Sequence, residues 1–321
     1  MPRHKCDQAL HGVAALSKDV KNVPASVRQR LLNLAHQRAE DFEFVRTKHA
    51  LERMLFRISQ SRYRDVFVLK GALLFELWTE QRYRPTRDAD FLARGENSTE
   101  RFKSMFKEIC GVIVADDDGW RFDPDTVTAE RIAENANYHG VRVKLFGYLE
   151  KARTQVQIDV GFGDSITPPP SEAEFPTLLD FPAPKLFVYS KESVVAEKFE
   201  AMIKLGIANS RMKGLYDVQS LSRKFSFAGA ILAKAINETF EKRKERIPAQ
   251  DMPVVFTSQF YGDEAKKKQW KAFCNKYRRY LTEESLESVC LEIAGFLTPV
   301  VEALRNKKSF DRAWSPRGRW S

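Results

Sequence analysis

Two aspartates separated by one residue are the sharpest chemical feature of the sequence. Asp88 and Asp90 lie in a short run, residues 88–92, that predicts a β-strand. Side chains at positions i and i+2 of a strand point to the same face, so the two carboxylates converge. They repel each other unless a cation neutralises them, and oxygen ligands suit Mg²⁺ or Mn²⁺. Asp159, on the polar side of the alternating run 155–160, could supply a third acid to this predicted metal site.

A lysine–glycine pair precedes the aspartates. Residues 65–69 predict a buried strand, which leads into Lys70 and Gly71 and then into an apolar helix face. Backbone N–H groups at a helix start favour phosphate, and glycine lets a phosphate approach closely. We therefore assign Lys70 and Gly71 to nucleotide binding, with Thr86 and Arg87 from the basic turn before the aspartates. The alternative is that Gly71 only permits a tight turn and Lys70 is solvated.

The spacing of apolar residues divides the chain into parts of different structure. Alternating residues in 141–145 and 155–160 predict two strands that pair as a hairpin, and a three-four apolar spacing predicts helices on both sides of the strand region. We expect an α/β fold. Its parts are a helical N-terminal segment (1–64), a core (65–167), a Pro-rich linker (168–189), a helical C-terminal domain (190–304) and a basic tail (305–321).

Composition narrows the class of protein. The chain has 321 residues and a net charge of +10, which favours a polyanionic partner such as nucleic acid. Apolar and charged residues make up 43% and 30%, a balance typical of a globular chain, and no uncharged apolar stretch is long enough for a membrane span. The sequence shows no secretory signal. Its four cysteines are scattered along the chain: Cys6, Cys110, Cys274 and Cys290. We therefore expect neither disulfides nor a zinc site, and we expect a cytoplasmic location.

Four motifs in order resemble a known family. The motifs VLKGALLFELW and RPTRDADF, the segment 189–198 with Ala-Glu-Lys at its end, and the basic segment 211–217 ending in Asp217 resemble the AbiEii/AbiGii-type nucleotidyltransferases. These belong to the polymerase-β-like superfamily and include toxins of type IV toxin–antitoxin and abortive-infection (phage-defence) systems and the MenT toxins. The chain departs from the family pattern at Ala72 and at Gly214. The resemblance implies a polymerase-β-like core with a mixed sheet.

The resemblance also implies roles for individual residues. Asp88, Asp90 and Asp159 would hold Mg²⁺ against a nucleoside triphosphate, and Lys70 and Gly71 would cradle its phosphates. Lys198 would contact the triphosphate and Asp217 would orient Lys198 or the acceptor; both are included among the catalytic residues.

Each of these residues has a simpler interpretation. Lys198 could be a solvated helix residue paired with a neighbouring glutamate, and Asp217 could be a helix-capping residue. Asp159 could be an exposed strand residue opposite Arg142 or Lys144.

The C-terminal part suggests an acceptor. Seven basic residues between 266 and 279 surround aromatic residues at helical spacing, which predicts aromatics that pack inward and lysines that follow a phosphate backbone. The tail could grip RNA or be disordered. We expect transfer of a nucleoside monophosphate to RNA, most plausibly the tRNA 3′ end, and neutralisation by a cognate antitoxin. Transfer to a protein side chain or a small molecule, and a non-catalytic nucleic-acid- or partner-binding module, are the alternatives.

Overall fold

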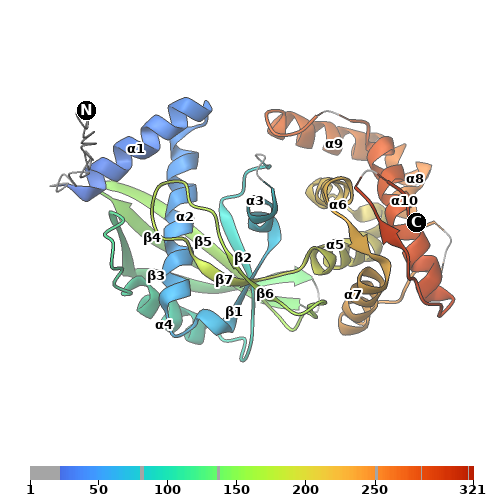
Figure 1. Cartoon of the computed structure of the whole chain (residues 1–321), viewed down its shortest axis with the longest axis horizontal. Coiled ribbons are helices and arrows are strands. Elements are labelled where there is room, and N and C mark those ends of the chain that lie inside the picture. Colours follow the sequence, from blue (N-terminus) through green and yellow to red (C-terminus); the bar gives the residue numbers. More distant parts are fainter. Residues whose placement is uncertain (1–21, 80–82, 136–137, 250–251, 283, 317) are drawn as a thin grey trace, which may run out of the picture.

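The molecule consists of a sheet lobe and a helical lobe that lie side by side (Figure 1). The structure is a computed structural model, and it describes residues 22–79, 83–135, 138–249, 252–282, 284–316 and 318–321. The first 21 residues of the expected N-terminal helical segment lie outside the described residues. The rest of that segment is helical, as expected, and belongs to the sheet lobe (Figure 1).

A seven-stranded mixed sheet organises the first lobe, in the order β3-β4-β5-β2-β1-β7-β6. Strand β1 pairs with β7 in parallel and β2 pairs with β5 in parallel, whereas the other neighbours are antiparallel. The expected α/β fold class is confirmed, and β4 and β5 form the expected hairpin. The strands are β1 (Phe67–Lys70), β2 (Asp88–Ala93), β3 (Trp120–Asn135), β4 (Tyr138–Leu149), β5 (Ala152–Phe162), β6 (Ser171–Glu174) and β7 (Lys185–Val188).

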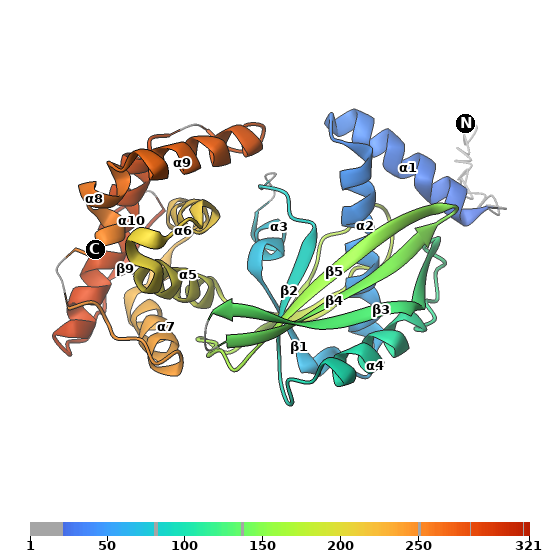
Figure 2. The ribbon, with the colours of Figure 1, turned by 180° about the vertical axis from the view of Figure 1, so that it is seen from behind.

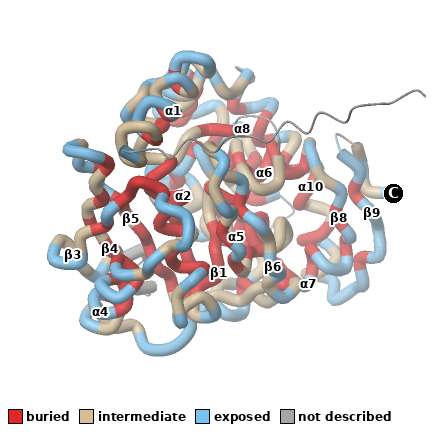
Figure 3. Tube along the Cα trace, turned by 60° about the vertical axis from the view of Figure 1, so that its left-hand side comes forward, coloured by how far each residue is buried: buried red, intermediate tan, exposed pale blue. Residues whose placement is uncertain are grey.

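Helices cover one face of this sheet. Figures 1 and 2 show α2 (Phe42–Gln60) and α4 (Thr99–Cys110) on the same side of the strands, with α1 (Val23–Arg38) packed on α2. The side-chain oxygens of Asp41 and Ser98 accept backbone N–H groups at the starts of α2 and α4, which fixes where these helices begin. The strand residues beneath them are buried, as the red segments of the tube in Figure 3 indicate. The opposite face of the sheet is left for polar side chains.

The segment expected to be a Pro-rich linker contributes two strands to the sheet. Strands β6 and β7 pair with each other, and β7 pairs with β1 through Val68 and Leu69. The prolines flank these strands, at 168–170, 176, 182 and 184, so none of them interrupts a ladder of hydrogen bonds. The prolines thus mark the ends of these strands and do not form a linker without strands.

The second lobe is built from helices. The expected helix from about Ser190 is confirmed as α5, and the hydroxyl oxygen of Ser190 caps its first turn. Helix α5 spans Lys191–Leu205, and the other helices of this lobe are α6 (Met212–Lys224), α7 (Gly229–Lys242), α8 (Ser258–Tyr261), α9 (Glu264–Tyr277) and α10 (Leu286–Arg305). The strands β8 (Phe227–Ala228) and β9 (Ala313–Trp314) form a pair. The first lobe also contains the short helix α3 (Leu74–Trp78), and 3₁₀ turns lie at Arg64–Val66, Gly71–Leu73, Gly206–Ala208 and Val254–Phe256.

The basic tail is folded onto this lobe, so its described residues are not disordered. Trp314 is buried and donates its indole N–H to the Ser222 carbonyl, and Trp320 donates to the Phe296 carbonyl. The Trp320 ring also stacks on the Phe296 ring. The two tryptophans therefore anchor the tail, because burying a large aromatic ring with a satisfied N–H is favourable.

Helix α9 forms the outer rim of the helical lobe (Figure 1). Trp270 is buried and Phe273 and Tyr277 are half-buried, so its aromatic side faces the lobe, as expected. Lys267, Lys268, Lys271 and Lys276 are exposed, whereas Lys266 is buried. No helix among the described residues is both long and apolar enough to cross a membrane.

Candidate active site

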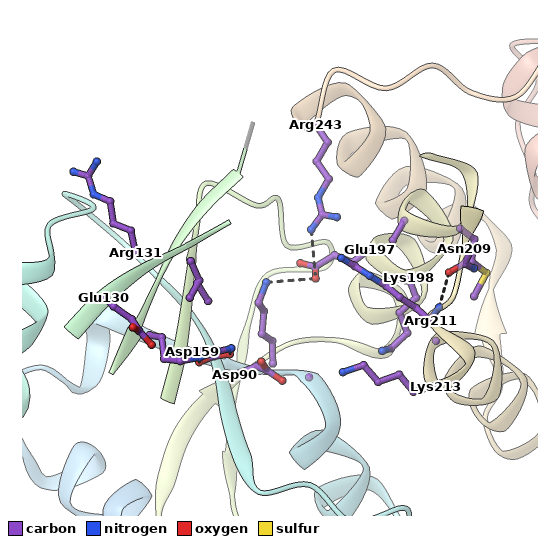
Figure 4. Close-up of a pocket in the computed structure, with 17 residues that line it drawn as sticks. Asp90, Glu130, Arg131, Asp159, Glu197, Lys198, Asn209, Arg211, Lys213 and Arg243 are labelled. Carbon is purple, nitrogen blue, oxygen red and sulfur yellow. Dashed lines mark hydrogen bonds and ion pairs between the residues drawn. The ribbon is translucent and has the colours of Figure 1, made fainter. Parts of the chain in front are cut away.

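A pocket of about 770 Å³ lies between the two lobes. Strands of the sheet form one wall, and α5, the start of α6 and the end of α7 form the other (Figure 4). Acidic side chains predominate on the strand β2 and β5 part of the first wall, and cationic side chains gather on the second. The lining includes Lys70, Gly71, Asp90, Glu130, Arg142, Asp159, Glu197, Lys198, Asn209, Arg211, Lys213 and Arg243.

The sheet wall carries one row of charged residues that crosses five strands. Strand pairing places Glu130 opposite Arg142, Arg142 opposite Asp159, Asp159 opposite Asp90, and Asp90 opposite Lys70. Cross-strand partners share a face of the sheet, so all five side chains lie on the face opposite α2 and α4. The structure thus brings Asp159 next to Asp90, although the two are far apart in the sequence.

Asp90 is the member of this row that lacks a partner. Within the described part of the chain, its carboxylate makes no hydrogen bond or ion pair, whereas Asp88 accepts the hydroxyl of Thr86. Burial, followed by the negative charge of Asp88, raises the pKa of Asp90 to about 6. A carboxylate that lines a pocket and is in no ion pair is a group that a bound ligand can complete.

Gly71 is required by this aspartate. Its φ is +78°, and a Cβ atom at this position would lie 2.1 Å from Oδ2 of Asp90. The sequence offered two interpretations of Gly71, phosphate approach or a tight turn. The structure adds a third reason, since only glycine leaves room for the carboxylate of Asp90 beside β1.

Asp159 is already bound by a cation. Arg142 donates from Nε and Nη2 to its two carboxylate oxygens at 2.8 and 2.6 Å, and Gln157 donates to one of them at 3.3 Å. This is the arginine that the sequence placed opposite Asp159 as an alternative. Asp159 therefore lies opposite Arg142, as that alternative expected, but it is buried and not exposed.

Lys70 points away from the aspartate row. Its ammonium lies 3.0 Å from Asp164 and 3.5 Å from Glu197, and Arg243 binds the same two acids from the end of α7. Although burial opposes it, the charges of Lys70 and Arg243 hold the pKa of Asp164 well below its usual range, whereas burial raises the pKa of Glu197 to about 7. Lys70 thus joins the lobes. The helix expected after Lys70 and Gly71 is α3, which has only five residues.

A second cluster surrounds Asp217 in the helical wall. Asp217 is fully buried and accepts from Nε and Nη2 of Arg84 at 2.8 and 2.6 Å and from the Tyr83 hydroxyl at 2.7 Å, while Nζ of Lys198 lies 2.8 Å away. Although burial opposes it, Lys198 and Arg84 hold the pKa of Asp217 well below its usual range. Asp217 lies within α6, so it is not a capping residue. It fixes Lys198 at the pocket wall.

Some residues of the pocket were not among the predicted site residues. Arg211, Lys213 and Arg243 line it, and Tyr83 and Arg84 hold Asp217. Arg84 belongs to the same basic turn as Thr86 and Arg87, and this position in the sequence could have indicated that Arg84 belongs to the site.

Two of the predicted nucleotide-binding residues, Thr86 and Arg87, lie outside the lining of the pocket. Arg87 is exposed, and Thr86 bonds Asp88. Neither residue lines the pocket.

The carboxylates of β2 suit a divalent cation. Asp88 and Asp90 occupy one face of the strand, and the unpaired oxygens of Asp90 are donors of the kind that Mg²⁺ or Mn²⁺ prefers. Among the described residues no group of three acidic, histidine or cysteine side chains is arranged as a metal site. Asp159 would have to leave Arg142 to become a third ligand.

Comparisons with known proteins give no curated relative and two solved structures of low sequence identity. No curated protein matches the chain. A Helicobacter pylori protein provisionally described as a nucleotidyltransferase aligns at 14% identity with a TM-score of 0.42, covering 80% of this chain and 94% of that chain. JHP933 from Helicobacter pylori aligns at 13% identity with a TM-score of 0.45, covering 81% and 93%.

A model of a protein family matches most of the chain. It is described as the nucleotidyl transferase AbiEii toxin of type IV toxin–antitoxin systems, and it matches residues 53–311, which include both walls of the pocket. The match covers most of the chain and confirms the resemblance seen in the motifs. The chain is an enzyme of the nucleotidyltransferase class and belongs to the AbiEii toxin family.

Proposed function

We propose that this enzyme transfers a nucleoside monophosphate from a nucleoside triphosphate to the 3′ end of RNA, most plausibly tRNA, with Mg²⁺ or Mn²⁺ as the metal. Blocking the acceptor end of tRNA would stop translation in the cytoplasm, and a cognate antitoxin would neutralise the effect. The family supports the toxin and its antitoxin partner. The acceptor, the metal and the residues are our own assignment.

One observation carries the proposal: the unpaired carboxylate of Asp90 and the ammonium of Lys198 line opposite walls of one pocket. Asp88 lies on the same face of β2 as Asp90. A triphosphate with a bound metal carries both kinds of charge, since its metal seeks carboxylates and its phosphate oxygens seek cations. Asp90 and Asp159 on the sheet wall, facing Lys198, Arg211 and Lys213 on the helical wall, match this distribution.

The residues divide the chemistry between the walls. Asp88, Asp90 and Asp159 are the proposed metal ligands. The metal would supply charge neutralisation and alignment for attack on the α-phosphate. Lys198, oriented by Asp217, and Lys213 and Arg211 would bind phosphate oxygens.

The remaining predicted residues would act around this centre. The exposed Arg87 would contact the nucleotide at the pocket edge. Thr86 would act through Asp88, whose carboxylate it bonds, and Gly71 through the space that it leaves for Asp90. Lys70 would contribute positive charge near Asp90 while it remains paired with Asp164.

Surface charge supports a nucleic-acid acceptor. The net charge of +10 and the exposed lysines of α9 at the rim of the molecule would attract a polyanion through counterion release. A protein side chain or a small molecule would gain less from such a surface. The remaining acceptor classes are outcomes of the experiment below.

The test is transfer of labelled nucleotide. Purified enzyme is incubated with each labelled nucleoside triphosphate, Mg²⁺ and total RNA, and Asp88→Ala and Asp90→Ala should each lower transfer about a thousandfold, since the metal contributes several kcal/mol. Asp125→Ala, on an exposed part of β3, is the matched control and should retain activity. Label on protein alone would contradict the RNA acceptor, and undiminished transfer by Asp90→Ala would contradict the site.

A further inference from the structure

Arg142 and Asp159 form a two-point ion pair in the sheet wall of the pocket. The guanidinium uses Nε and Nη2 to reach both carboxylate oxygens, at 2.8 and 2.6 Å. Asp90, the neighbour of Asp159 across the β2–β5 pairing, makes no such contact among the described residues. Of two adjacent acids in one row, one is therefore fully engaged and the other is free.

We infer that Arg142 is a positioning residue that holds Asp159 in the nucleotide-free enzyme, and that Asp159 exchanges Arg142 for the divalent cation when metal and nucleotide bind. The inference rests on the proposed function, because it concerns the metal of that reaction. Without both Arg142 and the metal, the charge on Asp88, Asp90 and Asp159 would be offset only in part, by Lys70 and Lys213. Arg142 supplies the missing charge and occupies the third ligand until the cation arrives.

The local structure permits this exchange. The side chain of Arg142 is 32% exposed, so its guanidinium can leave Asp159 without opening the core. Arg142 lines the pocket, and a released guanidinium remains within the space where phosphate oxygens would lie. Its other cross-strand neighbour, Glu130, is bound by Lys144 at 2.8 Å and does not need Arg142.

A different role for the pair has a different signature. If Asp159 only anchored Arg142 as a permanent phosphate-binding residue, the carboxylate would never bind the metal. Removing the guanidinium would then weaken nucleotide binding and leave metal binding unaffected, apart from the loss of one positive charge. Metal binding without nucleotide therefore separates the two roles.

The experiment measures Mn²⁺ binding to the nucleotide-free enzyme by electron paramagnetic resonance of the free ion. Arg142→Gln should tighten Mn²⁺ binding about tenfold, because Asp159 becomes available as a ligand. Lys213→Gln removes an equal charge from the pocket without touching Asp159, and it should tighten binding by less than about threefold. A gain for Arg142→Gln no larger than that for Lys213→Gln would overturn the inference.

A double substitution assigns the gain to the pair. In Arg142→Gln combined with Asp159→Asn, the extra affinity should disappear, since the freed ligand is gone. Arg142→Lys keeps the charge but loses the two-point geometry and should fall between the native enzyme and Arg142→Gln, which guards against a folding defect in the latter. If the tighter binding survives in the double variant, Asp159 is not the ligand released.

Failure of this inference can be told apart from failure of the proposed function. Loss of RNA labelling in Asp90→Ala with unchanged Mn²⁺ binding in Arg142→Gln would leave the proposed reaction standing and reject the exchange. Absence of labelling by the native enzyme, with the Mn²⁺ pattern as expected, would reject the proposed reaction and retain the exchange.

Discussion

The two walls of the pocket treat their central aspartates in opposite ways. Asp217 in the helical wall is fully buried, and its carboxylate is bound by Arg84, Lys198 and Tyr83. Asp90 in the sheet wall has no partner among the described residues. The pKa of Asp217 is held below its usual range by the cations, whereas burial raises that of Asp90 to about 6.

This difference distinguishes a completed scaffold from a ligand site. A buried carboxylate that has all its partners fixes neighbouring side chains, here Lys198, at little cost in reorganisation. A partly buried carboxylate without partners costs folding free energy and is retained where a ligand supplies the missing charge. Neutralising Asp217 should therefore lower the free energy of unfolding, whereas neutralising Asp90 should raise it.

The largest effect is expected for Asp217→Asn. An asparagine leaves Arg84 and Lys198 without their shared counter-ion, and breaking a buried ion pair from one side costs about 3–5 kcal/mol. The free energy of unfolding from urea denaturation measures this loss. Glu264→Gln, which disrupts an exposed pair with Lys267, is the control and should cost no more than about 0.5 kcal/mol. An equal, small change in both variants would remove the distinction between the walls.

Gly71→Ala tests the geometry of the sheet wall. Alanine would adopt a strained positive φ, and its Cβ would push against the carboxylate of Asp90, so we expect a loss of about 2 kcal/mol in stability together with reduced transfer. In a protein that already carries Asp90→Ala the contact is absent, so adding Gly71→Ala should cost only the strain of about 1 kcal/mol relative to Asp90→Ala alone. Thermal unfolding of the three variants measures the coupling. If the two substitutions are additive, Asp90 is not the reason for the glycine.

Much of the architecture around these walls could be predicted from local patterns. Alternation of polar and apolar residues identified β4 and β5 and placed Asp159 on the polar side, and the serine before α5 marked the start of that helix. Such signals lie within a few residues of the element that they determine. The same pattern suggested Asp159 as a third acid beside Asp88 and Asp90, and the strand pairing places Asp159 next to Asp90.

The partners of the charged residues could not be predicted in the same way. Asp217 and Tyr83 are 134 positions apart, and Lys70 is 94 positions from Asp164. No local pattern says which of many cations a folded chain brings to a given acid. For this reason Lys70 was expected at a phosphate and lies in an ion pair that joins the lobes.

Asp90→Asn should stabilise the enzyme at neutral pH. The carboxyl of Asp90 binds its proton more tightly in the folded chain, with a pKa of about 6 against 3.8. The folded state is thus favoured at acidic pH, and this contribution is lost as the pH rises through about 6. Asparagine does not ionise, so the variant does not lose this stability as the pH rises. At pH 7 its free energy of unfolding should exceed that of the native protein by about 1–2 kcal/mol, allowing for partial solvent screening.

Urea denaturation of both proteins between pH 4 and pH 8 measures the Asp90→Asn advantage, and the difference between them should shrink toward pH 4. Asp125→Asn removes an exposed carboxylate of the same lobe and should show a pH-independent difference of less than about 0.5 kcal/mol. A destabilised Asp90→Asn at pH 7 would mean that Asp90 has a partner in solution, and the contrast with Asp217 would fail.

The smallest expected effect is at Tyr83. Its hydroxyl donates to Asp217 at 2.7 Å, but Arg84 and Lys198 remain when the hydroxyl is removed. Tyr83→Phe should therefore cost only about 1 kcal/mol, the net value of one hydrogen bond, and the stacking of its ring on Phe75 is preserved. Denaturant unfolding checks the value, and combination with Asp217→Asn should add little, because the acceptor is already weakened. A loss as large as that of Asp217→Asn would show that the hydroxyl, and not the two cations, keeps the helical wall complete.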